Sequence, residues 1–413
     1  MRPSRDQPQE FGSRSPFFNS EKVLNKKVLT TALLASAAAA GTAHAQSSVT
    51  LYGIIDAGIS YANHSKTATG GSEKIFKYDD GVAQGSRWGL RGAEDLGGGL
   101  KALFVLESGF NSGTGASGQG GALFGRQAYV GVSKDGIGSL TLGRQYSFST
   151  DYLGGNYSTG GLTVAGNYAY HINDVDQLTS SRINNSVKFT SANFAGLTFG
   201  AMYGFSNQAG AFGGAPATGT AANPVAGSSR AYSFGVNYAN GPIGVGAAYT
   251  DIRFPSQATP AFSTSIANVS TGTVRDLRTF GLGGRYILGP ATLYALWTNT
   301  HFEPITGSST TFNNFEGGAK YAFTPALTGG LGYTYSRLTG ATTGHFNQVD
   351  ASVDYALSKR TDVYVLGIYQ DASGKTGTQP IQAQIGSATS YFNTSGSGSQ
   401  NQLAFRVGMR HKF

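Results

Sequence analysis

The sequence has no cysteine and few charged side chains, because Asp, Glu, Lys and Arg together make up only 13% of it. Without cysteine, disulfides, thiolate metal sites and cysteine nucleophiles are excluded. After residue 49, no run of 18 apolar residues occurs. A membrane-spanning helix needs about 20 such residues, so this part of the chain cannot cross a membrane as helices.

Signals for metal, phosphate and catalytic sites are also missing. Five histidines follow residue 45, at His64, His171, His301, His345 and His411, and no two have metal-ligand spacing. The chain has no glycine-rich loop with the lysine that cradles phosphates. No nucleophile, base and orienting acid can be assigned to one strand wall. We therefore expect no enzyme activity, no metal and no cofactor.

The N-terminus has the pattern of a secretory signal. Three lysines precede an apolar run at 28–40, and the run is followed by Ala-His-Ala at 43–45. A basic region, a short apolar core and a small-residue cleavage site are typical of a signal peptide. We assign 22–45 to the signal, 1–21 to an extra leader outside the fold, and 46–413 to one mature domain. The basic residues are dispersed in an exported chain, so no nucleic-acid partner is expected.

What the sequence does contain favours strands. Glycine accounts for 61 of the 413 residues, about one in seven, and the chain has 22 tyrosines and 25 phenylalanines. Average proteins contain roughly 7% glycine. Long helices tolerate so much glycine poorly, whereas strands accept aromatic residues readily. The composition therefore predicts an all-β protein.

Turns divide the chain after residue 49 into segments of about ten residues. Gly, Pro, Asn or Asp turns of the hairpin kind lie at 94–99, 133–138, 193–196, 239–242, 288–291, 323–326 and 357–360. Longer polar stretches alternate with them, at 61–84, 111–121, 148–180, 207–229, 254–274, 303–312, 339–345 and 372–399. Seven short turns and eight long loops join sixteen strands, an even number as closed outer-membrane barrels require.

Side chains alternate in character along these segments. In 100–108, leucine, alanine and phenylalanine side chains oppose Lys101 and Glu107. A soluble sandwich would alternate too, but it would not need short and long loops in strict succession. The chain also ends on Phe413, which resembles the terminal signal read by the outer-membrane assembly machinery. In lipid a sheet must close, because open edges leave backbone groups unsatisfied. We predict a 16-stranded antiparallel transmembrane β-barrel with short periplasmic turns and long extracellular loops.

The stretch SRWGLRGAED (86–95) illustrates the two faces of such a barrel. On a strand, Arg87 and Arg91 share one face, and Trp88 and Leu90 share the other. In a soluble sheet this arrangement would be inverted, but a barrel in lipid keeps water inside. Both arginines are therefore predicted to line a channel, Arg91 nearer its periplasmic end.

Several segments resemble a known family. SSVTLYGIIDAGISY, SRWGLRGAEDLGGGLKALFVLESG, FGRQAYVGVS, GSLTLGRQYS, DYALSKRTDVYVLGIYQ and the terminal VGMRHKF are similar to the general diffusion porins of Gram-negative bacteria, particularly those of β-proteobacteria. The similarity spans nearly all of 46–413. It implies a homotrimer and a third loop that folds inward to narrow the pore.

The resemblance also implies a basic cluster on the pore wall. Arg87, Arg126 and Arg182 stand at the positions that match this cluster, whereas a lysine position of the enterobacterial relatives holds Ile54. Alternation conflicts with Arg126, because its face would include Val130 and turn toward lipid. A charge there would cost about 2–4 kcal/mol at mid-depth, which favours the lumen.

Acidic groups are expected to face these arginines. The candidates are Glu107 and Asp56 on the wall, and Asp151 and Asp174 on the third loop. Lys101 is expected to line the lower pore together with Arg91. Arg144 has outward parity, and the resemblance suggests that it lies at a subunit contact.

These residues predict the function of the channel. Three arginines against two or three acids indicate a positive to balanced constriction, because arginine stays protonated. We expect an outer-membrane porin of a Gram-negative bacterium that passes small hydrophilic solutes and ions with weak to moderate anion preference. The expected partners are two further copies of the chain, outer-membrane lipid and lipopolysaccharide, and the barrel assembly machinery. A substrate-selective channel for sugars or aromatic acids is the alternative, and a barrel enzyme is a more distant one.

Overall fold

The alternating segments form long strands that are rich in β-branched and aromatic residues, as their composition favours. The structure is a computed structural model that describes residues 48–219, 223–225, 227–255, 269, 271, 273–388, 391–392 and 396–413. The leader at 1–21 and the signal peptide at 22–45 lie outside the described residues.

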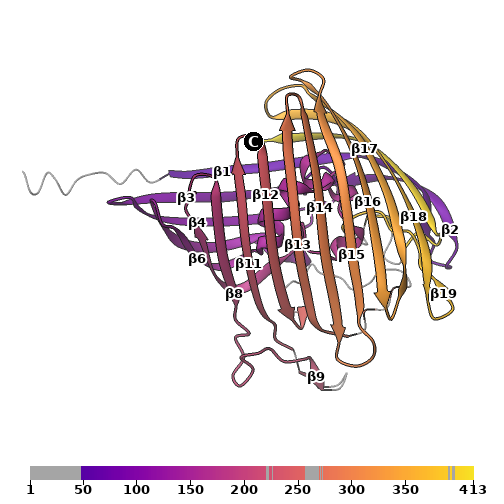
Figure 1. Cartoon of the computed structure of the whole chain (residues 1–413), viewed down its shortest axis with the longest axis horizontal. Coiled ribbons are helices and arrows are strands. Elements are labelled where there is room, and N and C mark those ends of the chain that lie inside the picture. The colour runs from indigo at the N-terminus through magenta and orange to yellow at the C-terminus, as the bar shows by residue number, and fades with distance from the viewer. Residues whose placement is uncertain are drawn as a thin grey trace, which may run out of the picture. The chain divides into compact units, whose positions relative to one another are not determined.

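Within the described residues, sixteen strands pair in one closed antiparallel sheet, so the predicted barrel is confirmed (Figure 1). Its strands are β1 (Ser48–Lys66), β3 (Arg87–Gly97), β4 (Leu100–Gly109), β5 (Gln127–Lys134), β6 (Gly138–Tyr146), β7 (Arg182–Ser191), β8 (Leu197–Gly204), β11 (Arg230–Asn240), β12 (Ile243–Arg253), β13 (Val274–Leu288), β14 (Ala291–Pro304), β15 (Thr310–Ala322), β16 (Leu327–Gly340), β17 (Thr343–Ala356), β18 (Thr361–Thr376) and β20 (Asn401–Lys412). β20 pairs with β1 and closes the barrel.

All seven predicted short turns connect consecutive strands at one end of the barrel. The other end differs from the sequence prediction, because strand pairing extends into several predicted loops. β14 runs to Pro304 and β15 begins at Thr310, and β16 and β17 are separated by two residues only. Antiparallel strands that a short turn joins can stay paired in water as well, so pairing continues past the apolar band.

Smaller elements complete the long-loop end. β2 (Ser72–Asp80) continues the sheet beside β1 where β3 begins, and β19 (Gln379–Pro380) pairs with β18. β9 (Thr218–Gly219) pairs with β10 (Pro224–Val225), and η1 (Gln119–Gly121) is a 3-10 turn in the second loop. Among the residues described, no helix has the length and apolar character needed to cross a membrane.

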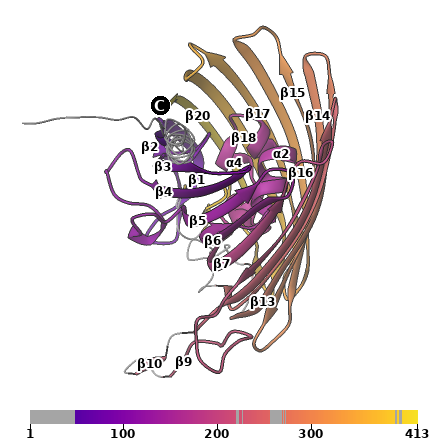
Figure 2. The ribbon, with the colours of Figure 1, turned by 90° about the vertical axis from the view of Figure 1, so that its left-hand side faces the viewer.

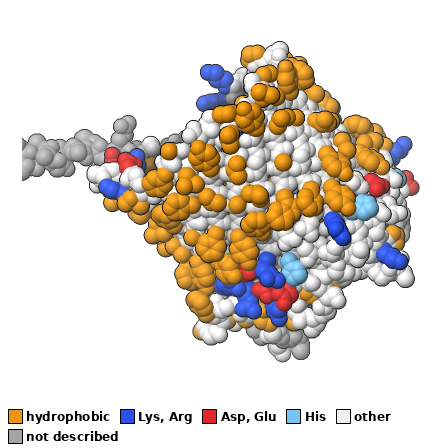
Figure 3. Space-filling view, in the orientation of Figure 1, with side chains coloured by type: hydrophobic (Ala, Val, Ile, Leu, Met, Phe, Trp, Pro, Cys, Tyr) orange, Lys and Arg blue, Asp and Glu red, His pale blue; other side chains and the backbone are white. Residues whose placement is uncertain are grey.

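The outer face of the barrel is apolar and the inner face is polar. Figure 3 shows hydrophobic side chains spread over the outside of the long strands. Large exposed side chains on this face include Val236, Leu282, Phe315 and Val365. Their neighbours in sequence point inward, where threonine, serine and ionisable side chains are buried. Water therefore faces the polar side and lipid faces the apolar side.

The third long loop (147–181) folds into the barrel, as the resemblance implied (Figure 2). It contains the short helical turns η2 (Ser149–Gly154), α2 (Gly155–Tyr157), α3 (Thr159–Leu162), α4 (Gly166–Ala169) and η3 (Ile172–Asp174). The loop packs against inward-facing glycines of the long-strand wall. A Cβ atom at Gly246 or Gly283 would come within 2.6 Å of Tyr157, so glycine is required for this close approach.

Candidate functional site

The three predicted arginines lie where strands begin at the long-loop end. Arg87 is the first residue of β3 and Arg182 the first of β7. Before Arg87, residues 81–86 leave the wall and touch the third loop, where the Asn167 amide donates to the Val82 carbonyl over 2.6 Å. The chain turns back into β3 at this contact, which places Arg87 on the inner face beside the loop.

Arg126 also points inward, and the structure explains why alternation suggested otherwise. It precedes β5, in a bend of the chain, so the parity of the strand does not apply to it. Within β5, Val130 and Val132 are exposed on the outer face, as predicted. The guanidinium of Arg126 reaches Glu107 of β4, with 2.7 Å between Nε and Oε1.

Tyr146, the last residue of β6, joins the arginines into one cluster. Arg182 donates to the Tyr146 hydroxyl over 3.0 Å, and its guanidinium carbon lies 4.8 Å from the centre of the ring. The guanidinium carbon of Arg126 lies 6.0 Å from the same ring. Glu107 also accepts a hydrogen bond from the Tyr52 hydroxyl over 3.1 Å. The Glu107 carboxylate and the Tyr146 phenol thus stabilise Arg126 and Arg182, two cations that would otherwise repel one another.

These arginines line the large hollow of the lumen, whose volume is about 620 Å³. Among its described lining residues, five side chains are basic and three are acidic, namely Lys77, Arg87, Arg126, Arg182, Arg410, Asp79, Asp80 and Asp151. The balance of formal charge of these lining side chains is 5 − 3 = +2, and Glu107 behind Arg126 and Asp362 behind Arg410 offset part of it. The lining of this hollow is therefore positive to balanced, the charge that the sequence predicts for the constriction, and the role of these residues as the constriction stays a prediction.

The predicted acids are not all brought to this hollow. Asp151 lines it and pairs with Lys188. Asp174 is 1% exposed, and its carboxylate instead accepts from the amides of Thr179 and Ser180 within the third loop. Asp56 is buried too, with 3.3 Å between its Oδ1 and Nη2 of Arg406. The carboxylates of Asp56 and Asp174 therefore do not contact permeating ions directly, and they act on these ions only by long-range electrostatic interaction.

Three further predicted residues lie elsewhere along the barrel, and their roles in the lower pore and at a subunit contact stay predictions. Arg91 faces inward, with its guanidinium carbon 5.3 Å from the Tyr52 ring centre. Lys101 lies 3.7 Å from Asp135 near the short turns. Arg144 pairs with the outward-facing Ala128, and its Nε donates to the Gly125 carbonyl over 2.8 Å.

The C-terminal residue takes part in closing the barrel. Phe413 exchanges two backbone hydrogen bonds with Gly53 of β1, of 3.0 and 3.1 Å. A Cβ atom at position 53 would collide with the Phe413 ring, so glycine leaves room for the terminal side chain. This pairing joins the last strand to the first, and it leaves the assembly role of Phe413 a prediction.

Sequence reasoning omitted several residues of the site. Arg410 lines the hollow and pairs with Asp362 over 2.9 Å. Its inward parity in the last strand could have indicated it. The sequence gives no comparable indication for Tyr146 and Lys77. The position of Lys77 depends on the course of β2, and that of Tyr146 depends on where the third loop turns inward.

A buried polar cluster anchors the third loop to the opposite wall. His171 lies between two carboxylates, with Nδ1 close to Asp176 and Nε2 3.1 Å from Glu316 of β15. Both ring nitrogens face acceptors, so both carry protons and the ring is cationic. Burial alone would lower the pKa of His171, but the two carboxylates outweigh it and hold the pKa well above its usual range. Glu316 also accepts from the Thr159 amide.

Asp174 predicts a dependence of loop stability on pH. Burial, with a smaller contribution from Asp176, raises its pKa to about 7. A raised folded-state pKa stabilises the fold below the unfolded value near 4, and this stabilisation is lost as the pH rises through 7. The free energy of unfolding changes by at most about 4 kcal/mol over this pH range. We expect the unfolding temperature of the barrel to fall between pH 4 and pH 7, and Asp174→Asn to flatten that slope. Asp135→Asn, at an exposed turn, should retain the parental slope, and an unchanged slope in Asp174→Asn would contradict the assignment.

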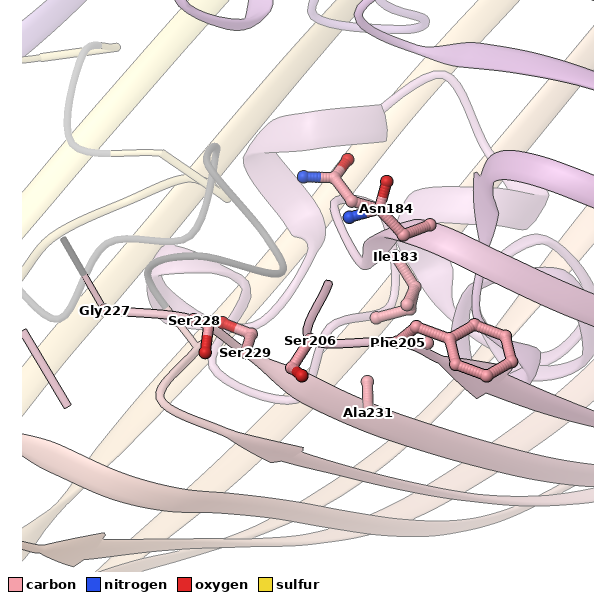
Figure 4. Close-up of a pocket in the computed structure, with 10 residues that line it drawn as sticks. Ile183, Asn184, Phe205, Ser206, Gly227, Ser228, Ser229 and Ala231 are labelled. Carbon is pink, nitrogen blue, oxygen red and sulfur yellow. The ribbon is translucent and has the colours of Figure 1, made fainter. Parts of the chain in front are cut away.

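A second, smaller hollow in the described part of the structure is not lined by charged groups. A hollow of about 130 Å³ lies between the starts of β7 and β11 and the end of β8, beside Asn184, Ser206 and Ser229 (Figure 4). Its described lining residues carry no ionisable side chain. Within the ranges that the structure describes, no group of three His, Asp or Glu side chains could hold a metal ion.

Comparison with known proteins identifies the family. A family model described as Gram-negative porin matches residues 30–375. An outer membrane porin protein of Bordetella pertussis is 33% identical over 382 residues, which are 84% of this chain and 94% of that protein. The structure of an anion-selective porin from Comamonas acidovorans has a TM-score of 0.67 and 26% identity, covering 89% of this chain and 100% of that one. OmpT of Vibrio cholerae in its trimer form shares the fold alone, with a TM-score of 0.60, 15% identity, and coverage of 89% and 99%. The chain belongs to the family of Gram-negative porins.

Proposed function

We propose that this porin prefers anions weakly to moderately among the small hydrophilic solutes and ions that it admits. As a member of its family, the chain forms a passive diffusion channel in the outer membrane and is not an enzyme. The observation that carries the preference is the convergence of Arg87, Arg126 and Arg182 on one hollow. The similar structure from Comamonas acidovorans, which is named an anion-selective porin, supports the same preference.

The charge arrangement explains why the preference would be modest. Arginine cannot lose its proton to relieve the field at neutral pH. Asp79, Asp80 and Asp151 border the same hollow, so cations also find partners there. Opposed charges across a narrow passage create a transverse field, which orders water and slows apolar solutes. The result is a polar filter whose lining side chains carry a small excess of positive charge.

The assembly and the ends of the chain complete the proposal. We infer a homotrimer with Arg144 at a subunit contact, a signal at 22–45 after a leader at 1–21, and a mature porin at 46–413. The hydrogen bond from Arg144 to the Gly125 carbonyl holds this cation at the outer face of the wall, where a neighbouring copy of the chain can contact it. The trimer form of OmpT has the same barrel fold. Outer-membrane lipid, lipopolysaccharide and, through Phe413, the barrel assembly machinery are the proposed further partners.

Two measurements on the purified channel test the proposal. In a tenfold KCl gradient across a planar bilayer, the reversal potential should have the sign of anion preference. Strong cation preference would contradict the assigned role of the arginines. In liposome swelling, rates should decline steadily with solute size, since no single solute is selected. Saturable entry of one sugar or aromatic acid would instead favour a substrate-selective channel.

A further inference from the structure

We propose that Asp350 of β17 positions the third loop, and that it does so only while its carboxyl group is neutral. The residue lies on the inner face of the barrel and is 0% exposed. The proposal concerns how the passage is kept open, so it rests on the third loop bordering the hollow and not on the anion preference. It makes the open state of the channel depend on pH.

Asp350 lies beneath the part of the third loop that contains α3 and α4 (Figure 2). Its partner across the sheet is Gly332 of β16, where a Cβ atom would collide with the Thr159 side chain. Gln348 lies two residues earlier on the same face, with its Nε2 3.3 Å from the carbonyl oxygen of Ala169 at the end of α4. The loop therefore covers the wall at Asp350 and keeps water from its carboxyl group.

No cation is available to pair with an ionised Asp350. Within the described part of the chain, no basic side chain forms an ion pair with it, and its Oδ2 has no hydrogen-bond partner. The cation that acts on it from a distance is His171, whose two ring nitrogens are bound by Asp176 and Glu316. Glu316 also repels a negative charge at Asp350. An unpaired carboxylate in a buried site is costly, so Asp350 keeps its proton at neutral pH.

The remaining side chains around Asp350 do not supply a compensating charge. The residues beside it in β16 and β18 are Gly332 and Ile368. Tyr294 of β14 is a phenol and is neutral at this pH, and the Tyr168 hydroxyl of α4 donates to a serine of β1. The two carboxylates and the histidine carry −2 + 1 = −1, so an ionised Asp350 brings the buried charge to −2.

Two glutamine amides transmit the protonation state of Asp350 to the loop. Gln370 Nε2 donates to Gln348 Oε1 over 2.8 Å, which directs the Gln348 amino group toward Asp350 Oδ1, 3.0 Å away. The same amino group faces the Ala169 carbonyl. A carboxylate accepts a hydrogen bond about twice as strongly as a neutral carboxyl group. Ionised Asp350 therefore draws the amino group away from the loop, and repulsion by Glu316 adds to the loss of contact.

Closures of single channels in planar bilayers, recorded from pH 6 to pH 9 in the Asp174→Asn protein, test the proposal. This background removes the titration of Asp174. We expect the fraction of time spent closed to rise about fivefold over this range, the factor that the loss of one hydrogen bond brings. Asp350→Asn, which keeps a neutral group of the same shape, should abolish the rise. Asp371→Asn makes the same exchange on the outer face of β18 and should retain it.

Three results would overturn the inference: no rise in closures in the Asp174→Asn protein, a rise that persists after Asp350→Asn, or a rise that Asp371→Asn also abolishes. The reversal potential of the same channels tests the anion preference independently.

Infrared spectra of the Asp174→Asn protein provide a second measurement, which serves even if Asp350→Asn does not fold. The C=O stretch of a buried, protonated carboxyl group should be present at pH 6 and weaken by pH 9. In Gln348→Leu the band should move to higher frequency, because the hydrogen bond to Asp350 Oδ1 is lost. A spectrum at pH 6 that Gln348→Leu leaves unchanged would contradict a neutral Asp350.

Discussion

Replacing the three arginines of the constriction together, as Arg87→Gln/Arg126→Gln/Arg182→Gln, should abolish or reverse the anion preference. An ion about 4 Å from a unit charge in water gains about 1 kcal/mol, or roughly fivefold in local concentration. Removing three such charges from one hollow should therefore lower the anion-to-cation permeability ratio about fivefold or more. The measurement is the reversal potential in a KCl gradient.

Two further variants make this prediction specific. Glu107→Gln leaves Arg126 without its carboxylate and should shift the ratio toward anions. Arg337→Gln/Lys359→Gln/Lys375→Gln removes three exposed cations that do not line the hollow, and the ratio should stay near the parental value. Equal shifts in the constriction variant and this control would mean that overall charge sets the selectivity.

The second large effect is expected for His171→Ala, which removes the cation between Asp176 and Glu316. Breaking a buried ion pair on one side leaves an uncompensated charge and costs about 3–5 kcal/mol. The third loop packs against the long-strand wall on one side and borders the hollow with the arginines on the other, so we expect a loosened loop to move into the passage. We expect a lower mean single-channel conductance with frequent closures in planar bilayers.

His345→Ala is the matched control for this variant. His345 lies on the outer face of β17, with its ring centre 5.8 Å from that of Tyr335, away from the third loop. Its removal should leave conductance and closures unchanged. Parental conductance and closure rates in His171→Ala would show that apolar packing, such as Tyr157 against Gly246 and Gly283, anchors the loop alone.

The barrel itself could be predicted because its signals are local. Lipid outside and water inside impose a period of two on every strand, and the short turns carry their own glycine, proline and asparagine signatures. The limits of the strands were less predictable. The apolar pattern ends with the bilayer, whereas backbone pairing continues beyond it, as at β14 and β15.

The candidate site was predictable only in part. The inward parity of Arg87 and Arg91 followed from alternation, whereas Arg126 lies in a bend where alternation fails. Asp174 was expected to face the arginines from the third loop. It lies in that loop, but its carboxylate accepts hydrogen bonds from the amides of Thr179 and Ser180 instead. Loop side chains follow no period, so their directions depend on the path of the loop.

The sequence by itself thus determined a sixteen-stranded barrel and its inner and outer faces, since both follow from neighbours along a strand, whereas the basic wall was expected from the resemblance to porins. Only the tertiary structure decided which groups meet across the lumen. Tyr146 joins Arg126 and Arg182, and His171 meets Glu316, 145 positions apart in the chain. These contacts depend on the closed barrel bringing distant segments together around the third loop, and no local period encodes them.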